Sequence, residues 1–228
     1  MQTIGVIGGL GPQATMDFEQ RVHRVAQQLN PQQPRQSYPP MLVYYHRHAP
    51  VVSEDGRTPV LPIRVDPRLL EAARRLGTWA DFLVITSNGV HMFQHEIEQA
   101  AGRKVVSMID ATVAEIKRRG LRRVGVLGLF EPRVYYAPLD QIGVQYETID
   151  GALQARLNEA IFAVTEGRAH ETYNVGRDVI AALRAKHVEA IVLGCTEIPF
   201  MLPQWESDPT LINPLHLLAE AAVHAAID

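Results

Sequence analysis

The chain has 228 residues and a mass of 25.4 kDa, with 46% hydrophobic and 21% charged residues. This composition is typical of a compact folded protein and excludes a chain that is mainly disordered. The 22 basic residues nearly balance the 25 acidic ones, giving a formal net charge of −3. We therefore expect no nucleic acid and no membrane surface as partner, and a small molecule is the expected ligand.

The cellular location is predicted from the cysteine content and from what the sequence lacks. A single cysteine, Cys195, excludes a disulfide within the chain and favours a reducing, cytoplasmic compartment. No apolar run approaches the roughly 20 residues of a membrane-spanning helix. The first residues, MQTIGVIGG, have neither the basic region nor the cleavage site of a signal peptide.

Short apolar segments alternate with amphipathic ones along the chain, which predicts the α/β fold class with mainly parallel sheets flanked by helices. The predicted strands are residues 3–7, 41–45, 82–86, 105–108, 124–129, 144–148, 190–194 and 210–213. The predicted helices are residues 12–29, 67–76, 92–101, 110–119 with Asp110 as the N-cap, 153–166, 172–186 and 215–227. Loops are predicted at residues 31–40 and 48–62, and the second loop is long enough to be functional.

Two of the predicted strands end in a small residue able to act as a nucleophile or a base. Ser87 follows FLVIT, and Cys195 follows AIVLG about half the chain later. Ligands of open α/β sheets bind outside the carboxyl ends of the strands. Two such halves facing each other would place Ser87 and Cys195 on opposite sides of one pocket.

The glycine-rich segment IGGLGP after the first predicted strand contains Gly9 and Gly11. It lacks the spacing of a dinucleotide fingerprint, and Pro12 removes one N–H donor that a pyrophosphate would need. We interpret this loop as one that lets the backbone approach a substrate closely.

Three motifs together carry a family resemblance: GVIGGLGPQAT near the N-terminus, SNGVH at 87–91 and LGCTEIP at 193–199. They resemble the aspartate/glutamate racemase family, of the Asp/Glu/hydantoin racemase superfamily, over nearly the whole chain. The resemblance implies two similar Rossmann-like or flavodoxin-like lobes with the active site in the cleft between them. We expect residues 1–100 with 208–228 to form the N-terminal lobe, and residues 101–207 the C-terminal lobe.

The resemblance also implies a cofactor-independent racemase of acidic amino acids, in which a cysteine from each lobe flanks the substrate Cα. A thiol suits this work because its free pKa of about 8.5, tunable downward, lets it act as base and as acid. The histidine pairs His46/His48 and His91/His95 lack an H-E-x-x-H arrangement. We accordingly expect neither a metal nor a cofactor.

The sequence departs from the family pattern at the first cysteine, since the family's C-N-T-x-H reads Ser87-Asn88-Gly89-Val90-His91. A symmetric two-thiol mechanism is impossible with Ser87, because a hydroxyl without an adjacent base is too weakly acidic. His91, one helical turn away, is the candidate to activate it.

Further departures lie outside that motif. LGLFEP at 127–132 occupies a turn where the resemblance predicts threonines that hold a carboxylate, and an apolar turn favours a substrate with one anionic group fewer or an apolar side chain. Tyr45-His46 stands where the family often has an asparagine after the second strand.

The candidate catalytic residues are Cys195 and Ser87. The candidate substrate-binding residues are Gly9, Gly11, Arg57, Asn88, Gly89, His91, Thr196 and Glu197. Among these, Arg57 is the expected bidentate partner of a carboxylate. Glu197 is expected to tune the thiol or to contact a substrate ammonium.

These residues favour an amino-acid racemase that uses Cys195 on a small carboxylate or amino-acid substrate. Loss of the first cysteine leaves two alternatives open. One is a one-cysteine decarboxylase or cis-trans isomerase of a small (di)carboxylate, and the other is a non-catalytic small-molecule binder. A homodimer is compatible with such a fold, but no segment identifies its interface.

Overall fold

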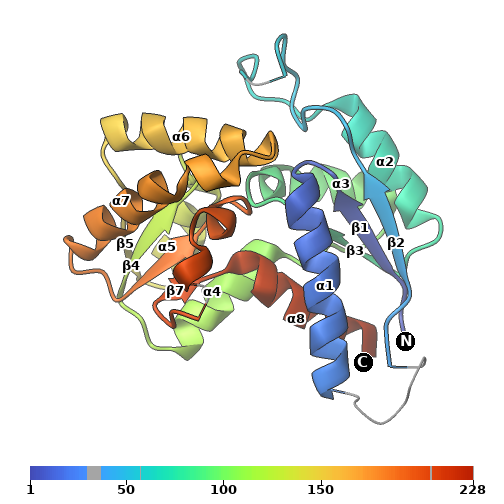
Figure 1. Ribbon diagram of the computed structural model, residues 1–228. Helices are drawn as coiled ribbons and strands as arrows, with labels where there is room; N and C mark the ends of the chain where they lie inside the picture. Colours follow the sequence, from blue (N-terminus) through green and yellow to red (C-terminus); the bar gives the residue numbers. More distant parts are fainter. Residues whose placement is uncertain (30–36, 57, 206, 228) are drawn as a thin grey trace. The chain divides into compact units, whose positions relative to one another are not determined.

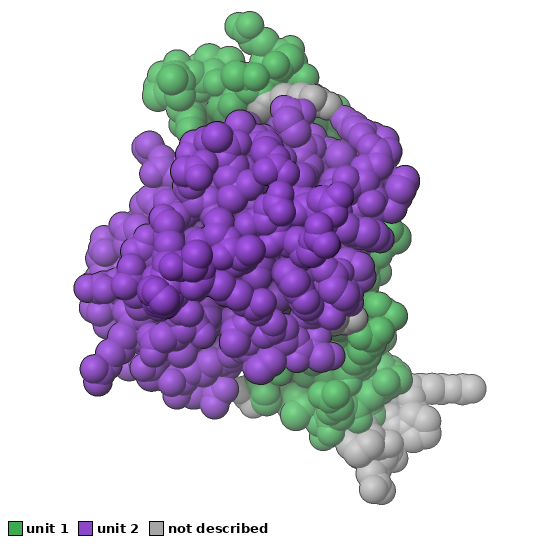
Figure 2. All heavy atoms as spheres, turned by 60° about the vertical axis from the view of Figure 1, so that its left-hand side comes forward, with its two compact units in different colours: residues 1–108, 218–228 green, residues 109–217 purple. Residues whose placement is uncertain are grey.

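The computed structural model describes residues 1–29, 37–56, 58–205 and 207–227. The chain divides into two compact units, Met1–Met108 with Leu218–Asp228, and Ile109–Leu217 (Figure 2, green and purple). Both divisions fall later in the chain than the boundaries after residues 100 and 207 that the sequence suggests.

The first unit contains a three-stranded parallel sheet in the order β2-β1-β3. Its strands are β1 (Ile4–Gly8), β2 (Met41–Tyr45) and β3 (Phe82–Ile85). Its helices are α1 (Pro12–Leu29) on one face of the sheet, and α2 (Pro67–Gly77) and α3 (Gln94–Ala101) on the other (Figure 1). Because the strands are parallel, their carboxyl ends share one edge of the sheet.

The second unit contains a four-stranded parallel sheet in the order β5-β4-β6-β7. Its strands are β4 (Arg123–Leu127), β5 (Gln145–Glu147), β6 (Ala190–Leu193) and β7 (Leu211–Ile212). Its helices are α4 (Met108–Arg118), α5 (Tyr136–Gln141), α6 (Gly151–Thr165) and α7 (Tyr173–Arg184). The last helix, α8 (Pro214–Ile227), begins in the second unit and continues into the first.

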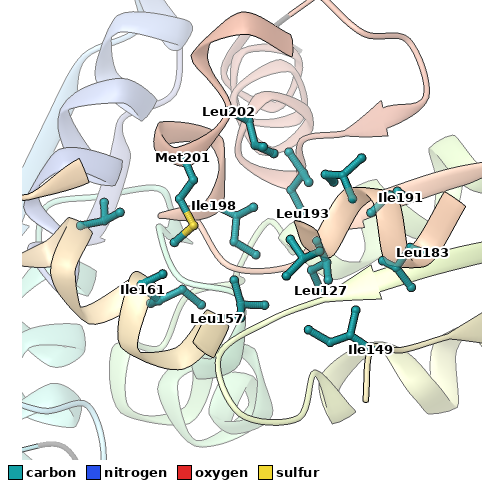
Figure 3. Packing of buried hydrophobic residues seen from close by; sticks show 14 residues of the cluster. Leu127, Ile149, Leu157, Ile161, Leu183, Ile191, Leu193, Ile198, Met201 and Leu202 are labelled. Carbon is teal, nitrogen blue, oxygen red and sulfur yellow. The ribbon is translucent and has the colours of Figure 1, made fainter. Parts of the chain in front are cut away.

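The second sheet is covered on both faces, which explains why its strands are continuous apolar runs. Leu127 and Leu193 point toward Leu157 of α6 in one buried cluster (Figure 3). Their strand neighbours Val126 and Val192 belong to the opposite cluster, with residues of α4 and α5. This alternation of faces along each strand is the period-two pattern of a β-sheet.

The α/β class and the two helix-flanked parallel sheets confirm the predicted fold. The predicted strand at 105–108 is wrong, because Val105 makes only an isolated bridge with Leu83 and α4 already begins at Met108. For the same reason Asp110 lies in the first turn of α4 and is not its N-cap. Helix α5 was not predicted from the sequence.

The predicted loop at 48–62 leaves the sheet after β2 and folds back on itself through two isolated antiparallel bridges. These join Val51 to Val65 and Ser53 to Pro59. The predicted loop at 31–40 lies partly outside the described residues. No helix in the described part of the chain is both long and apolar enough to cross a membrane.

Candidate active site

Cys195 lies just past the carboxyl end of β6 and forms a hydrogen-bonded pair with a buried carboxylate. Its Sγ donates to Glu197 Oε2 over 3.1 Å, and Thr196 Oγ1 donates to the same oxygen over 3.1 Å. Thr196 and Glu197 are buried, whereas Cys195 is half-buried. The thiol and the carboxylate are therefore joined by one short hydrogen bond, and Glu197 Oε2 is shielded from solvent.

The backbone before Cys195 passes through a space that only glycine fits. A Cβ on Gly194 would lie 2.4 Å from the Leu127 carbonyl oxygen and 3.1 Å from the ring of Tyr135. After Cys195, its carbonyl accepts from the N–H of Ile198 and starts a 3-10 helix, Ile198–Met201. The thiol is thus held at a tight turn between strand and helix.

Burial raises the pKa of the Cys195 thiol well above its usual range, and the Glu197 carboxylate raises it further. Two backbone N–H groups, of Glu197 and Leu129, act on the sulfur in the opposite direction. Burial also raises the pKa of Glu197. The structure thus tunes the thiol upward, against the expected downward shift. In this arrangement the Cys195 thiol carries the proton of its hydrogen bond to Glu197 Oε2.

The LGLFEP turn follows β4 and lies beside this site, because β4 and β6 are paired with Leu127 opposite Leu193. Phe130 has a left-handed backbone with φ of 56° and is 45% exposed. Two residues of α6, Gln154 and Asn158, hydrogen-bond this turn. Sequence reasoning missed both, since nothing in a polar helix surface indicates which distant turn it holds.

In the first unit, Ser87 follows β3 through the buried Thr86 and is half-buried. Thr86 Oγ1 lies 3.1 Å from Thr15 Oγ1, and Thr15 Oγ1 accepts from the N–H of Gly9 over 2.8 Å. These contacts tie the glycine-rich loop to the strand end that carries Ser87. Gly9 has φ of 79°, and a Cβ there would lie 2.7 Å from His46 N.

His91 is fixed by the backbone on both sides of its ring. Its Nδ1 lies 2.8 Å from the carbonyl oxygen of Ser87, and its Nε2 accepts from the N–H of Met108 over 3.1 Å. A backbone N–H can only donate, so the ring is the neutral Nδ1–H tautomer. Both ring nitrogens are engaged, and His91 is therefore not placed to act as the base for the Ser87 hydroxyl.

The remaining predicted substrate residues of this unit lie close to the same strand ends. Asn88 is buried, and the exposed Gly89 opens the 3-10 helix Gly89–Phe93. Gly11 accepts from the N–H of Thr15 at the start of α1. Arg57 lies outside the described residues.

His46 directly follows β2 and is a buried polar residue that was not among the predicted site residues. It is 2% exposed, and its Nε2 has no hydrogen-bond partner among the residues described. Burial lowers its pKa, and the neighbouring His48 lowers it further, so the ring is neutral. His48 in turn contacts Arg68 over 2.9 Å. No group of three or more metal-ligating side chains occurs in the parts of the chain that the structure describes.

The sequence profile of the Asp/Glu/hydantoin racemase family matches residues 7–222. The chain belongs to this family. The resemblance inferred from the three motifs is therefore confirmed, and Cys195 of LGCTEIP lies within the matched region.

Other members of the racemase family are similar in sequence or in fold. The chain is 23% identical to the broad specificity amino-acid racemase RacX of Bacillus subtilis (strain 168), over 96% of both chains. Its fold is similar to that of Picrophilus torridus aspartate racemase, with a TM-score of 0.81, 21% identity and coverage of 99% of this chain and 94% of that one. An aspartate racemase homologue from Pyrococcus horikoshii OT3 matches with a TM-score of 0.76, 22% identity and full coverage of both chains.

Proposed function

We propose that the protein is a cofactor-independent, racemase-type enzyme of amino acids in which Cys195 is the acid/base residue at the substrate Cα. The observation that carries the proposal is the hydrogen bond from Cys195 Sγ to Glu197 Oε2, formed within a motif of the racemase family. It supplies a proton donor and a proton acceptor 3.1 Å apart at the carboxyl end of a parallel strand, where α/β proteins bind ligands.

The pair holds one proton in its resting state, and this decides how each direction of the reaction begins. To protonate a Cα carbanion, Cys195 gives up its S–H proton and becomes a thiolate, on which the N–H groups of Glu197 and Leu129 act favourably. To remove a Cα proton, Cys195 must first lose its own. Glu197 is the acceptor within hydrogen-bond distance, and its raised pKa suits it to take that proton.

Ser87 is proposed as the group on the opposite face of Cα, and this makes proton exchange at Cα unequal on the two faces. Its hydroxyl is a poor base at neutral pH, and the ring nitrogens of His91 are bound to backbone groups. We infer that Ser87 relays a proton to and from solvent. Cα exchange is then slower from the enantiomer whose α-proton faces Ser87.

The remaining proposed contacts bind and orient the substrate. Arg57 pairs with its carboxylate, as a planar guanidinium does bidentately. The other proposed contacts, from backbone N–H groups or small polar side chains, are Gly9, Gly11, Asn88, Gly89, His91 and Thr196. Glu197 is assigned to Cys195 and not to a substrate ammonium, because its Oε2 already accepts from two side chains.

The test is solvent-deuterium exchange at Cα, followed by NMR over a panel of acidic, polar, aliphatic and aromatic amino acids, after dialysis against a chelator. Exchange with inversion supports the racemase. Exchange only with retention would indicate a one-base enzyme and favour the decarboxylase or isomerase alternative. Binding without exchange for every member of the panel would indicate a binder. The matched control is Cys195→Ala under the same conditions.

A further inference from the structure

We propose that Gln154 and Asn158 of α6 are positioning residues for Cys195, acting through the Gly128–Leu129–Phe130 turn, which they hold so that the Leu129 N–H donates to the sulfur. The inference rests on the proposed role of Cys195 but concerns residues outside the family motifs quoted above. Neither residue is placed to contact the substrate in this proposal.

The two side chains bind the turn on both sides of Leu129. Gln154 and Asn158 are four residues apart and lie on one face of the helix, where Gln154 Nε2 donates to Asn158 Oδ1 over 2.8 Å. Gln154 Nε2 also donates to the carbonyl of Gly128 over 2.9 Å, and Asn158 Oδ1 accepts from the N–H of Phe130 over 2.8 Å. The peptide groups before and after Leu129 are therefore fixed by one connected pair.

The turn needs such support because its backbone is strained. Phe130 has φ of 56°, a conformation that residues other than glycine, asparagine and aspartate rarely adopt. The residue is 45% exposed, and its ring lies 6.4 Å from that of Phe162 of α6. Strain of this kind persists only where the surrounding contacts determine the conformation, and here Asn158 and Gln154 supply those contacts.

The position of the turn connects it to the thiol. Leu127 and Leu193 are opposite each other in the paired strands β4 and β6, so the residues that follow each strand emerge side by side. A Cβ on Gly128 would lie 3.4 Å from the Gly194 carbonyl oxygen, which shows how closely the two segments run. The Leu129 N–H is one of the two backbone donors that lower the pKa of Cys195. This N–H therefore favours the thiolate, whereas burial and the Glu197 carboxylate favour the protonated thiol.

The experiment measures the reactivity of Cys195 directly, because it is the only cysteine in the sequence. Alkylation by iodoacetamide is followed from pH 6 to pH 10 in the wild type and in Asn158→Leu, Gln154→Leu and the double variant. We expect each variant to alkylate about tenfold more slowly at a fixed pH below the thiol pKa, with the profile displaced to higher pH. The double variant should be no slower than either single one, since the two residues act as one unit.

Two further measurements separate positioning from a general loss of structure. Glu159→Leu changes an exposed residue of the same helix and should leave the alkylation profile unchanged. In the wild type, the Leu129 amide proton resonance should move with the ionisation of Cys195, and it should not do so in Cys195→Ala. A folded Asn158→Leu with the wild-type profile, or a Leu129 amide that ignores the thiol, would overturn the proposal. Neither readout requires turnover, so a failed racemase assay would leave this result interpretable.

Discussion

The strands β3 and β6 each end beside a parallel neighbour, β1 and β4, but the residues that follow them present different chemistry. After β3 the chain offers the hydroxyl of Ser87, and the ring of His91 beside it is held by backbone groups on both sides. After β6 it offers the thiol of Cys195, hydrogen-bonded to a buried carboxylate. The fold thus places a polar side chain after each strand. The hydrogen bonds made by the residues next to that side chain determine whether it can accept or donate a proton.

The largest effect is expected from removing the Cys195 thiol that follows β6. Cys195→Ala should reduce Cα exchange by at least about 1,000-fold, in the upper part of the range for loss of an acid/base group. The fold should remain, because Cys195 is half-buried and a smaller side chain fits its place. Exchange and thermal unfolding are measured on the same sample. Wild-type exchange in a folded variant would remove Cys195 from the mechanism.

A second variant tests the comparison by placing a thiol after β3 as well as after β6. Ser87→Cys, alone and with Gly89→Thr, introduces a thiol on the first unit. It should accelerate Cα exchange from the enantiomer whose α-proton faces Ser87 by about 10- to 100-fold, while changing exchange from the other enantiomer little. Initial exchange rates are measured separately from each enantiomer. An equal change in both would mean that Ser87 does not limit one face.

Arg57 tests whether the loop of the first unit takes part in binding. A charge-assisted pair with a carboxylate is worth about 1.5–3 kcal/mol, so Arg57→Ala should raise the apparent KM by about 10- to 100-fold. Arg64, an exposed arginine seven positions along the chain, gives the control Arg64→Ala, which should leave KM unchanged. Equal effects of both variants would indicate a general charge effect and contradict a specific pair.

The smallest effect is expected from Glu197→Gln, which changes the hydrogen-bond acceptor of the Cys195 thiol. The carboxylate raises the pKa of the Cys195 thiol, so removing its charge should lower that pKa. Alkylation depends on the thiolate fraction, and the variant should therefore react about tenfold faster at a fixed pH, with its profile displaced to lower pH. This direction is opposite to that expected for Asn158→Leu. A profile displaced upward would contradict the assigned role of the carboxylate.

The sequence was sufficient for the features that depend on local patterns. Apolar runs located most of the strands, and LGCTEIP drew attention to Cys195, which the structure places directly after Gly194 at the end of β6. The run at 105–108 misled because its apolar residues belong to one isolated bridge and to the start of α4. Apolar character shows that a segment is buried, but not whether a partner strand is available for it.

The features that the sequence did not predict depend on contacts between distant segments. The direction of the thiol pKa follows from burial and from one carboxylate oxygen, and residue type alone suggested the opposite. The engagement of His91 requires the N–H of Met108, 17 positions away. The support of the Gly128 carbonyl comes from Gln154, 26 positions away. Hydrogen bonds of this range have no signal in local spacing.

The central claim, that one strand end carries the proton and the other does so poorly, is tested most directly by initial rates of Cα deuterium exchange from the two enantiomers of one substrate. The account predicts faster exchange from the enantiomer whose α-proton faces Cys195, with the asymmetry reduced in Ser87→Cys. Equal rates from both enantiomers of the wild-type protein would contradict it.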